Sequence, residues 1–263
     1  VYEIKHVYLW IKSTLYGESI MPRANRYYLP GHVWHITHRC HKKEFLLKFS
    51  KDRKRWRYWL FEARKRYGLS VLNFIITSNH IHLLVVDRGR GEIAKSMQLI
   101  AGRTAQEYNQ RKKRHGAFWE DRYHATALDA EQYLARCMVY IDLNMVRAGA
   151  VSHPDDWCWS GYCEIQRPPQ RYSVIDAEAL LTLFGVDDFE KLQQIHKGWI
   201  EDALKSEEGT RKPAWTQSIA VGSQDYLSRV KTALGVAGRY KAVVKEGAVE
   251  SLKEPFTPYM VDL

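Results

Sequence analysis

The sequence predicts an α+β fold: a ferredoxin-like antiparallel sheet with its helices on one face, followed by a C-terminal helical region. From residue 32 onward, β-forming runs and amphipathic stretches follow the order β-α-β-β-α-β, and a further helix comes next. The 263 residues are 45% hydrophobic, enough for one large core or for a core with a smaller appendage. Residues 1–169 hold 28 Lys and Arg against 16 Asp and Glu, whereas the remainder holds 12 against 14.

The predicted core begins after the Pro30-Gly31 turn, where β-forming residues alternate. Its first helix has an apolar stripe that includes Trp56 and Trp59, and it ends at Gly68, as many helices end at glycine. Two apolar runs joined at Ser78-Asn79 predict a hairpin. The expected strands are 32–39, 71–77, 80–86 and one ending near 128, and the expected helices are 51–67, one from about 92 and one over about 130–149.

Pro168 and Pro169 indicate a boundary, and the amphipathic stretches beyond them predict three or four helices. These are expected at about 176–184, 187–205, 223–234 and 239–252. Because Met21-Pro22-Arg23 stands just before the patterned region, residues 1–20 are expected to lie outside the working fold. The predicted division is therefore an N-terminal extension (1–20), a core domain (21–167) and a C-terminal helical region (168–263).

The basic surplus of the core favours a polyanionic partner. Nucleic acid is the leading candidate, and an anionic membrane surface is the alternative. No stretch approaches the roughly 18 apolar residues of a membrane span, so no membrane insertion is expected. The cysteines form no Cys-x2-Cys pair, which argues against a zinc knuckle and predicts reduced thiols in a cytoplasmic protein.

Two histidines, His80 and His82, open the apolar run at 80–86. Side chains alternate along a strand, so the two imidazoles point to the same face. Neutral imidazole is a common metal ligand, and a pair of them on a core strand suggests a metal site. The alternative is a pair of core histidines satisfied by hydrogen bonds.

A tyrosine and an asparagine, Tyr140 and Asn144, are separated by one helical turn in the last core helix. Residues at i and i+4 stand together on one helix face. Leu134, Met138 and Ile141 make the adjacent core stripe. The pair could simply share a hydrogen bond, or it could belong to a site with the histidines.

These segments, in this order, resemble the single-tyrosine transposases. Residues 77–85 (TSNHIHLLV) resemble their His-hydrophobic-His (HUH) motif, and residues 140–149 (YIDLNMVRAG) are similar to their nucleophile helix, with Met145 where the family has proline. Residues 31–37 and 118–124 resemble the family's first strand and its Trp-x-x-Arg-Tyr segment. The resemblance covers about 21–160, and the Tyr-x3-Asn spacing resembles the REP-associated branch of the insertion-sequence-200-like transposases.

The resemblance implies an HUH core and makes 21–167 the catalytic domain. It implies that Tyr140 attacks single-stranded DNA at palindromic repeat hairpins and forms a 5′-phosphotyrosine link. His80, His82 and Asn144 would hold a divalent metal, Mg²⁺ or Mn²⁺, and this mixed nitrogen and oxygen set suits Mn²⁺ at least as well. A homodimer with sites completed in trans is also possible in such a family.

Basic and aromatic residues outside this set are candidates for holding the DNA. Four consecutive cations at 111–114 are either a solvated run or phosphate contacts. Aromatic side chains could stack on unpaired bases. The candidates are Arg23, Arg26, Tyr27, Tyr28, Lys112, Lys113, Arg114 and Trp119. Two other functions remain open, a hairpin-binding protein without turnover and a nickase of the relaxase or replication-initiator kind.

Overall fold

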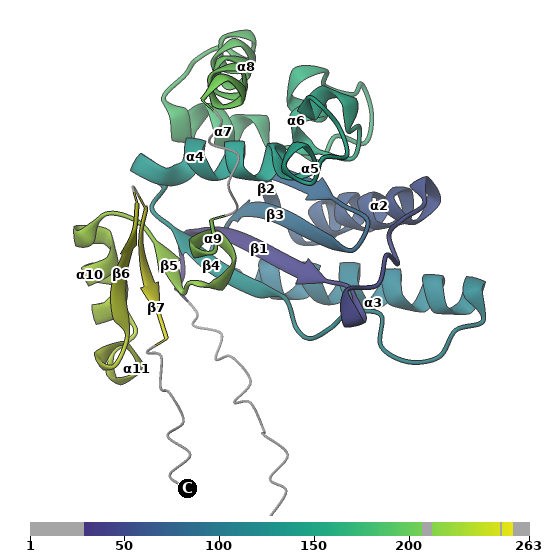
Figure 1. The fold of residues 1–263 in the computed structure, drawn as a ribbon, viewed down its shortest axis with the longest axis horizontal. Helices are drawn as coiled ribbons and strands as arrows, with labels where there is room; N and C mark the ends of the chain where they lie inside the picture. The colour runs from purple at the N-terminus through teal and green to yellow at the C-terminus, as the bar shows by residue number, and fades with distance from the viewer. Residues whose placement is uncertain (1–28, 207–211, 248, 255–263) are drawn as a thin grey trace, which may run out of the picture.

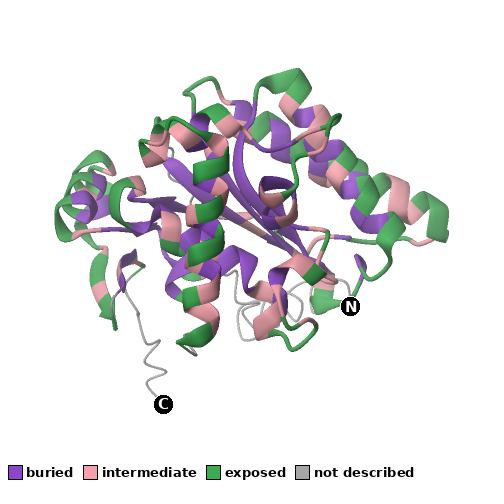
Figure 2. Cartoon of the chain, turned by 90° about the horizontal axis from the view of Figure 1, so that it is seen from above, coloured by how far each residue is buried: buried purple, intermediate pink, exposed green. Residues whose placement is uncertain are grey.

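A twisted β-sheet forms the centre of the computed structural model, which describes residues 29–206, 212–247 and 249–254. Within these residues the sheet has seven strands in the order β2-β3-β1-β4-β5-β7-β6. Figure 2 shows the central strands buried and the outer sides of the helices exposed. The predicted α+β class with an antiparallel sheet is confirmed, and no helix of the described residues is long and apolar enough to cross a membrane.

The four core strands pair antiparallel, with β1 (Val33–Arg39) between β3 (His80–Val86) and β4 (His124–Leu128), and β2 (Ser70–Ile76) beyond β3. The register sets Thr37 opposite His82 and His35 opposite both Leu84 and Thr126. Since residues directly opposite in a sheet share a face, one face carries histidine, threonine and asparagine side chains. The other face is mostly apolar, with Ile36, Phe74, Ile81 and Leu83, and His38 lies on it opposite Ile81.

Two helices cover the apolar face, and a third covers the polar face (Figure 1). The first two are α2 (Ser50–Tyr67), which ends at left-handed Gly68 as expected, and α3 (Glu92–Lys112). The third is α4 (Ala130–Asp142), which packs over β2 and meets β3 where Tyr140 contacts His82. The prediction of helices on one face therefore holds for α2 and α3, while α4 lies on the opposite face because its polar side chains have partners there.

The helix predicted over 130–149 is interrupted at Leu143, and α5 (Asn144–Arg147) follows α4 after this one residue. The backbone N–H of Leu143 still bonds the carbonyl of Val139 at 3.0 Å, and that of Arg147 bonds Leu143 at 2.9 Å. The helical direction therefore persists, and Tyr140 and Asn144 remain on one face as the spacing predicted.

Most of the predicted C-terminal helices are present, but the last is a β-hairpin. The helices α7 (Ala177–Phe184), α8 (Phe189–Lys205) and α10 (Gln224–Ala233) occupy the expected stretches. The helix expected over 239–252 is wrong, because β6 (Ala242–Glu246) and β7 (Val249–Lys253) occupy most of it. β-Branched valines suit a pleated strand, and left-handed Gly247 (φ +60°) begins the connection.

The sheet runs past the boundary predicted at residue 167. Strand β5 (Ala220–Val221) pairs parallel to β4, and β7 pairs antiparallel to β5. The C-terminal region therefore contributes strands to the central sheet as well as helices, so describing it as helical is incomplete. The remaining short elements are η1 (His41–Lys43), η2 (Pro154–Asp156), α6 (Gly161–Gln166), α9 (Ala214–Gln217) and α11 (Val236–Arg239).

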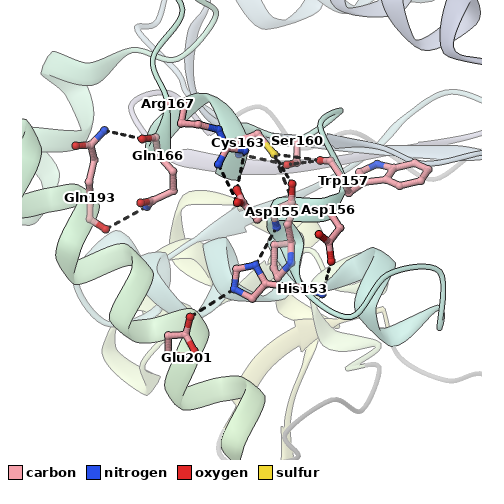
Figure 3. A network of polar contacts seen from close by, with 11 residues as sticks. His153, Asp155, Asp156, Trp157, Ser160, Cys163, Gln166, Arg167, Gln193 and Glu201 are labelled. Atoms are coloured by element: carbon pink, nitrogen blue, oxygen red, sulfur yellow. Dashed lines mark hydrogen bonds and ion pairs between the residues drawn. The ribbon is translucent and has the colours of Figure 1, made fainter.

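Polar contacts fasten α8 to the core. Gln166 donates to the carbonyl of Gln193 at 3.1 Å, and His153 lies 3.6 Å from Glu201 (Figure 3). Deeper in the structure, His196 contacts Asp142 at 2.8 Å, and Asp142 also accepts from Asn73 at 2.9 Å; all three side chains are fully or almost fully buried. Buried polar groups are costly without partners, so this network fixes α8 and α4 on the sheet.

Gly161 allows α6 to approach β2 closely, because a Cβ there would lie 2.2 Å from Oδ1 of Asn73 and 2.9 Å from the backbone N of Phe74. We expect Gly161→Ala to lower the free energy of unfolding by about 1–3 kcal/mol through overpacking. Gly198→Ala, at an exposed site in α8 where a Cβ meets nothing within 4 Å, should raise it by about 0.5–1 kcal/mol. Urea denaturation measures the free energy of unfolding of both variants. Equal changes in the two would contradict the close approach of α6 to β2 at Gly161.

Candidate active site

A cavity of about 600 Å³ opens where β1 and β3 meet α4 and α5. His80, His82, Tyr140 and Asn144, the four residues predicted for the reaction, all line it. They come from one chain, so no second copy is needed to bring the tyrosine to the histidines.

His80 lies at the mouth of the cavity and is held through its Nδ1 atom. That nitrogen is 2.7 Å from Oδ1 of Asn79 and 2.9 Å from the hydroxyl of Thr77. The amide nitrogen of Asn79 donates to the carbonyl of Lys43 at 3.2 Å, so its oxygen faces His80. Nδ1 of His80 therefore carries a proton, and the lone pair lies on Nε2.

His82 is buried one step further along the strand, with its ring centroid 5.1 Å from that of His80. Its Nε2 atom is 3.1 Å from Nδ2 of Asn144, and its Nδ1 atom is 2.9 Å from Nε2 of His35. The strand thus presents both imidazoles on one face, as the alternation predicted, and the helix brings its asparagine to the second one.

Tyr140 packs its ring among aromatic and cationic side chains. The ring centroid is 5.9 Å from that of His82 and 6.0 Å from that of Trp215 in α9. The guanidinium carbon of Arg147 lies 4.3 Å from the same centroid, at cation–π distance. The phenol is therefore held beside the histidines with a positive charge over its ring.

Arg147 was not among the predicted site residues, although its spacing from Tyr140 pointed to it. A residue at i+7 lies two helical turns further along the same face. Burial lowers the pKa of Arg147, and nearby Tyr140 and Asp142 act in the opposite direction. The guanidinium remains charged at neutral pH, because an arginine pKa starts far above 7.

Of the eight predicted DNA contacts, the four that the structure describes do not line this cavity. Arg23, Arg26, Tyr27 and Tyr28 lie outside the described residues, as does the predicted extension 1–20. Lys112 and Lys113 are exposed at the end of α3 and do not line the cavity. Arg114 donates to the carbonyl of Ala117, and Trp119 stacks on His38 at 4.0 Å and donates to the carbonyl of Ala101.

Other cations line the cavity instead, namely Arg39, Lys43 and Arg122. Arg39 is the last residue of β1 and lies directly opposite His80. Its place beside the cavity follows from the β1–β3 register, which the spacing of residues along the sequence does not reveal. Lys42 and Lys43 both have left-handed backbones, with φ of 51° and 60°. Such strain in non-glycine residues concentrates at functional sites, and here it accompanies the carbonyl that orients Asn79.

The donor set available for a metal is two imidazoles and one amide. In the described part of the chain, no group of three or more His, Cys, Asp and Glu side chains is arranged to hold a metal ion. A site at His80 and His82 would therefore draw on Asn144, whose amide can present either its nitrogen or its oxygen after rotation.

Burial lowers the pKa of His35 to about 4, so the ring is neutral at pH 7. The unfolded chain takes up this proton below about pH 6.5, whereas the folded chain does so only near pH 4. The free energy of unfolding should therefore fall by roughly 3 kcal/mol from this group as the pH drops from 7 to 4. The free energy of unfolding, measured by urea denaturation across this pH range, should depend less on pH in His35→Gln than in the unaltered chain. An equal pH dependence in both proteins would contradict a buried, neutral His35.

Comparison with known proteins places these residues in a family. Residues 29–144 match the family model described as "Transposase IS200 like". A solved REP-associated tyrosine transposase bound to a REP hairpin is 18% identical and covers 59% of this chain and 94% of its own, with a TM-score of 0.48. A putative transposase from Deinococcus radiodurans R1 is 16% identical and covers 45% and 95%, with a TM-score of 0.33. No curated protein matches significantly.

The matched residues run from the turn before β1 to Asn144, so they include both histidines and Tyr140. The family match indicates a transposase-like, DNA-cleaving function and confirms the relationship expected from the motifs. The histidine strand and the tyrosine helix that build this cavity both lie within the residues that match the family of IS200-like transposases.

Proposed function

We propose that this protein is a metal-dependent, single-strand DNA transposase of the REP-associated kind, with Tyr140 as its nucleophile. The observation that carries the proposal is the contact set at one cavity of one chain. Tyr140 lies beside His82, and His82 lies 3.1 Å from the amide of Asn144. A core histidine pair with no function would not need a tyrosine, an asparagine and an arginine at an open cavity.

The reaction is a transesterification. Oη of Tyr140 forms a bond to phosphorus while the bond from phosphorus to the 3′ oxygen breaks, which leaves a 5′-phosphotyrosine and a 3′-hydroxyl. The phenol loses its proton and the leaving oxygen gains one, so the step is balanced without an oxidant or an external energy source. A phosphotyrosine retains the phosphodiester for rejoining, which divides the exchange into two similar steps.

The residues that would hold a divalent metal fit the chemistry of Mn²⁺ or Mg²⁺. The Nε2 lone pair of His80 is set by Asn79, and Asn144 adds an amide that can offer its oxygen. A bound metal would polarise the scissile phosphate and stabilise the charge that develops on it. Two imidazoles and one amide leave room for ligands from the DNA and from water.

Arg147 supports the nucleophile electrostatically. A phenol with a pKa near 10 is mostly protonated at neutral pH, and a fixed positive charge nearby favours its ionised form. The guanidinium is close to the ring of Tyr140 and also donates to the backbone carbonyl of the same residue. This second contact keeps the cation in place while the phenol reacts.

The substrate that fits the surroundings is single-stranded DNA, presented at palindromic repeat hairpins. The net charge of +10 and the cations Arg39, Lys43 and Arg122 at the cavity favour a phosphate backbone. The site lies in a cavity of about 600 Å³, which suits an unpaired strand better than a duplex.

Covalent capture tests the nucleophile. A labelled single-stranded hairpin incubated with Mn²⁺ should give a denaturation-resistant adduct with the unaltered chain and none with Tyr140→Phe. Chelation with EDTA should also abolish the adduct. Tyr133→Phe is the matched control, since Tyr133 is also buried on α4 and contacts Trp215.

An adduct with Tyr140→Phe would contradict the assignment of the nucleophile. Hairpin binding without any adduct would favour a binding protein without turnover. Equal cleavage of linear or double-stranded DNA would favour a nickase of the relaxase or replication-initiator kind.

Salt dependence tests which cations meet the DNA. Each phosphate contact to a single strand contributes about 0.7 to the slope of log affinity against log salt. Lys43→Gln should therefore reduce that slope by about 0.7, because Lys43 lines the cavity, whereas Lys113→Gln should leave it nearly unchanged. Binding titrations at several salt concentrations measure both, and the reverse pattern would move the DNA path to the end of α3.

A further inference from the structure

His35 lies behind His82 and was not among the predicted site residues. It is fully buried in β1, and its Nε2 atom is 2.9 Å from Nδ1 of His82. Its other nitrogen, Nδ1, is 2.8 Å from the backbone carbonyl of Trp215 in α9. The two ring planes are within 12° of parallel and their centroids are 5.0 Å apart, which suits a hydrogen bond between their edges. The backbone carbonyl of Trp215 is thus connected through His35 to His82, a predicted metal ligand.

The carbonyl of Trp215 determines which ring nitrogens of His35 and His82 carry protons. A carbonyl oxygen can only accept, so Nδ1 of His35 must donate to it. In the neutral ring Nε2 of His35 is then an acceptor, and Nδ1 of His82 must be its donor. His82 therefore has its lone pair on Nε2, the atom that faces Asn144. Metal binding requires that lone pair.

We propose that His35 is a positioning residue that, through the Trp215 carbonyl, holds His82 in the tautomer able to bind a metal. The metal role itself rests on the proposed function. For His80, the side chain of Asn79 plays the same part, because it accepts from Nδ1 of His80 and donates to the carbonyl of Lys43. Each histidine of the strand therefore has its proton fixed by a backbone carbonyl acting through one side chain.

Without His35, the opposite tautomer would be favoured. The Nδ1 N–H of the buried His82 would lose its hydrogen bond to Nε2 of His35, and the loss of a buried hydrogen bond is costly. The proton would move to Nε2 and donate to the amide oxygen of Asn144 after rotation of that amide. The metal would then compete with a proton on the nitrogen it needs.

Trp215 connects this arrangement to the nucleophile. Its carbonyl also accepts from Thr126 at 3.3 Å, which keeps α9 against β4, and its indole packs on Tyr140 at 6.0 Å. One residue of the C-terminal region therefore contacts both the tyrosine and the histidine relay. The C-terminal region helps to form the active site through this residue.

The test measures the tautomer and the metal separately. Imidazole ¹⁵N chemical shifts of the metal-free full chain should assign the proton of His82 to Nδ1, and to Nε2 in His35→Phe. Mn²⁺ affinity, followed by electron paramagnetic resonance of the free ion, should fall by about 10–100-fold in His35→Phe. His35→Gln keeps an acceptor for His82, so it should retain the tautomer and most of the affinity.

His124→Phe is the matched control, because His124 bonds another carbonyl of the same segment, that of Ser218 at 3.0 Å. His124→Phe should leave the ¹⁵N shifts of His82 and the Mn²⁺ affinity unchanged. A change in this control would indicate a general loss of folding. The proposal is overturned if His82 carries its proton on Nε2 in the unaltered chain, or if His35→Phe changes neither readout. A correct tautomer with no Mn²⁺ binding would instead overturn the metal role in the proposed function.

Discussion

The polar face of the sheet is the constraint on which the site depends. Asn73, His35, His82 and Thr126 are all buried there, and each must find a hydrogen-bond partner. The partners come from elements packed over that face. Asp142 bonds Asn73, Asn144 contacts His82, and the segment around α9 supplies carbonyls to His35 and Thr126. The same requirement that holds the helices in place therefore brings the proposed catalytic residues together.

This arrangement explains why the two faces differ so clearly. Apolar side chains on one face need only shape and volume, so α2 and α3 can cover them with aromatic and aliphatic residues. Polar side chains need partners at fixed distances and directions. A helix over the polar face has less freedom to shift, and the positions of Tyr140 and Asn144 are accordingly well defined.

Local periodicity was sufficient for much of the fold and for placing each of the two predicted pairs of site residues on one face, whereas their roles were expected from the family resemblance. The alternation at His80 and His82 and the four-residue spacing of Tyr140 and Asn144 each depend only on strand or helix geometry. Apart from Arg147, whose spacing from Tyr140 is local, the residues that were missed depend on pairing between distant segments. Arg39 reaches the cavity through the β1–β3 register, and the Trp215 carbonyl bonds a histidine 180 residues earlier. The hairpin at β6 and β7 was mistaken for a helix because its short strands lacked a clear alternation of buried and exposed residues.

The bond between His35 and the Trp215 carbonyl also bears on how the protein matures during synthesis. Chains emerge from the ribosome N-terminus first, at about 5–20 residues per second. Tyr140, Asn144 and both histidines of β3 are therefore made well before α9, which starts at Ala214. A nascent chain that ends before α9 contains every proposed reacting group but lacks the carbonyl through which His35 is proposed to fix His82. Completion of the active site is thereby linked to completion of the chain.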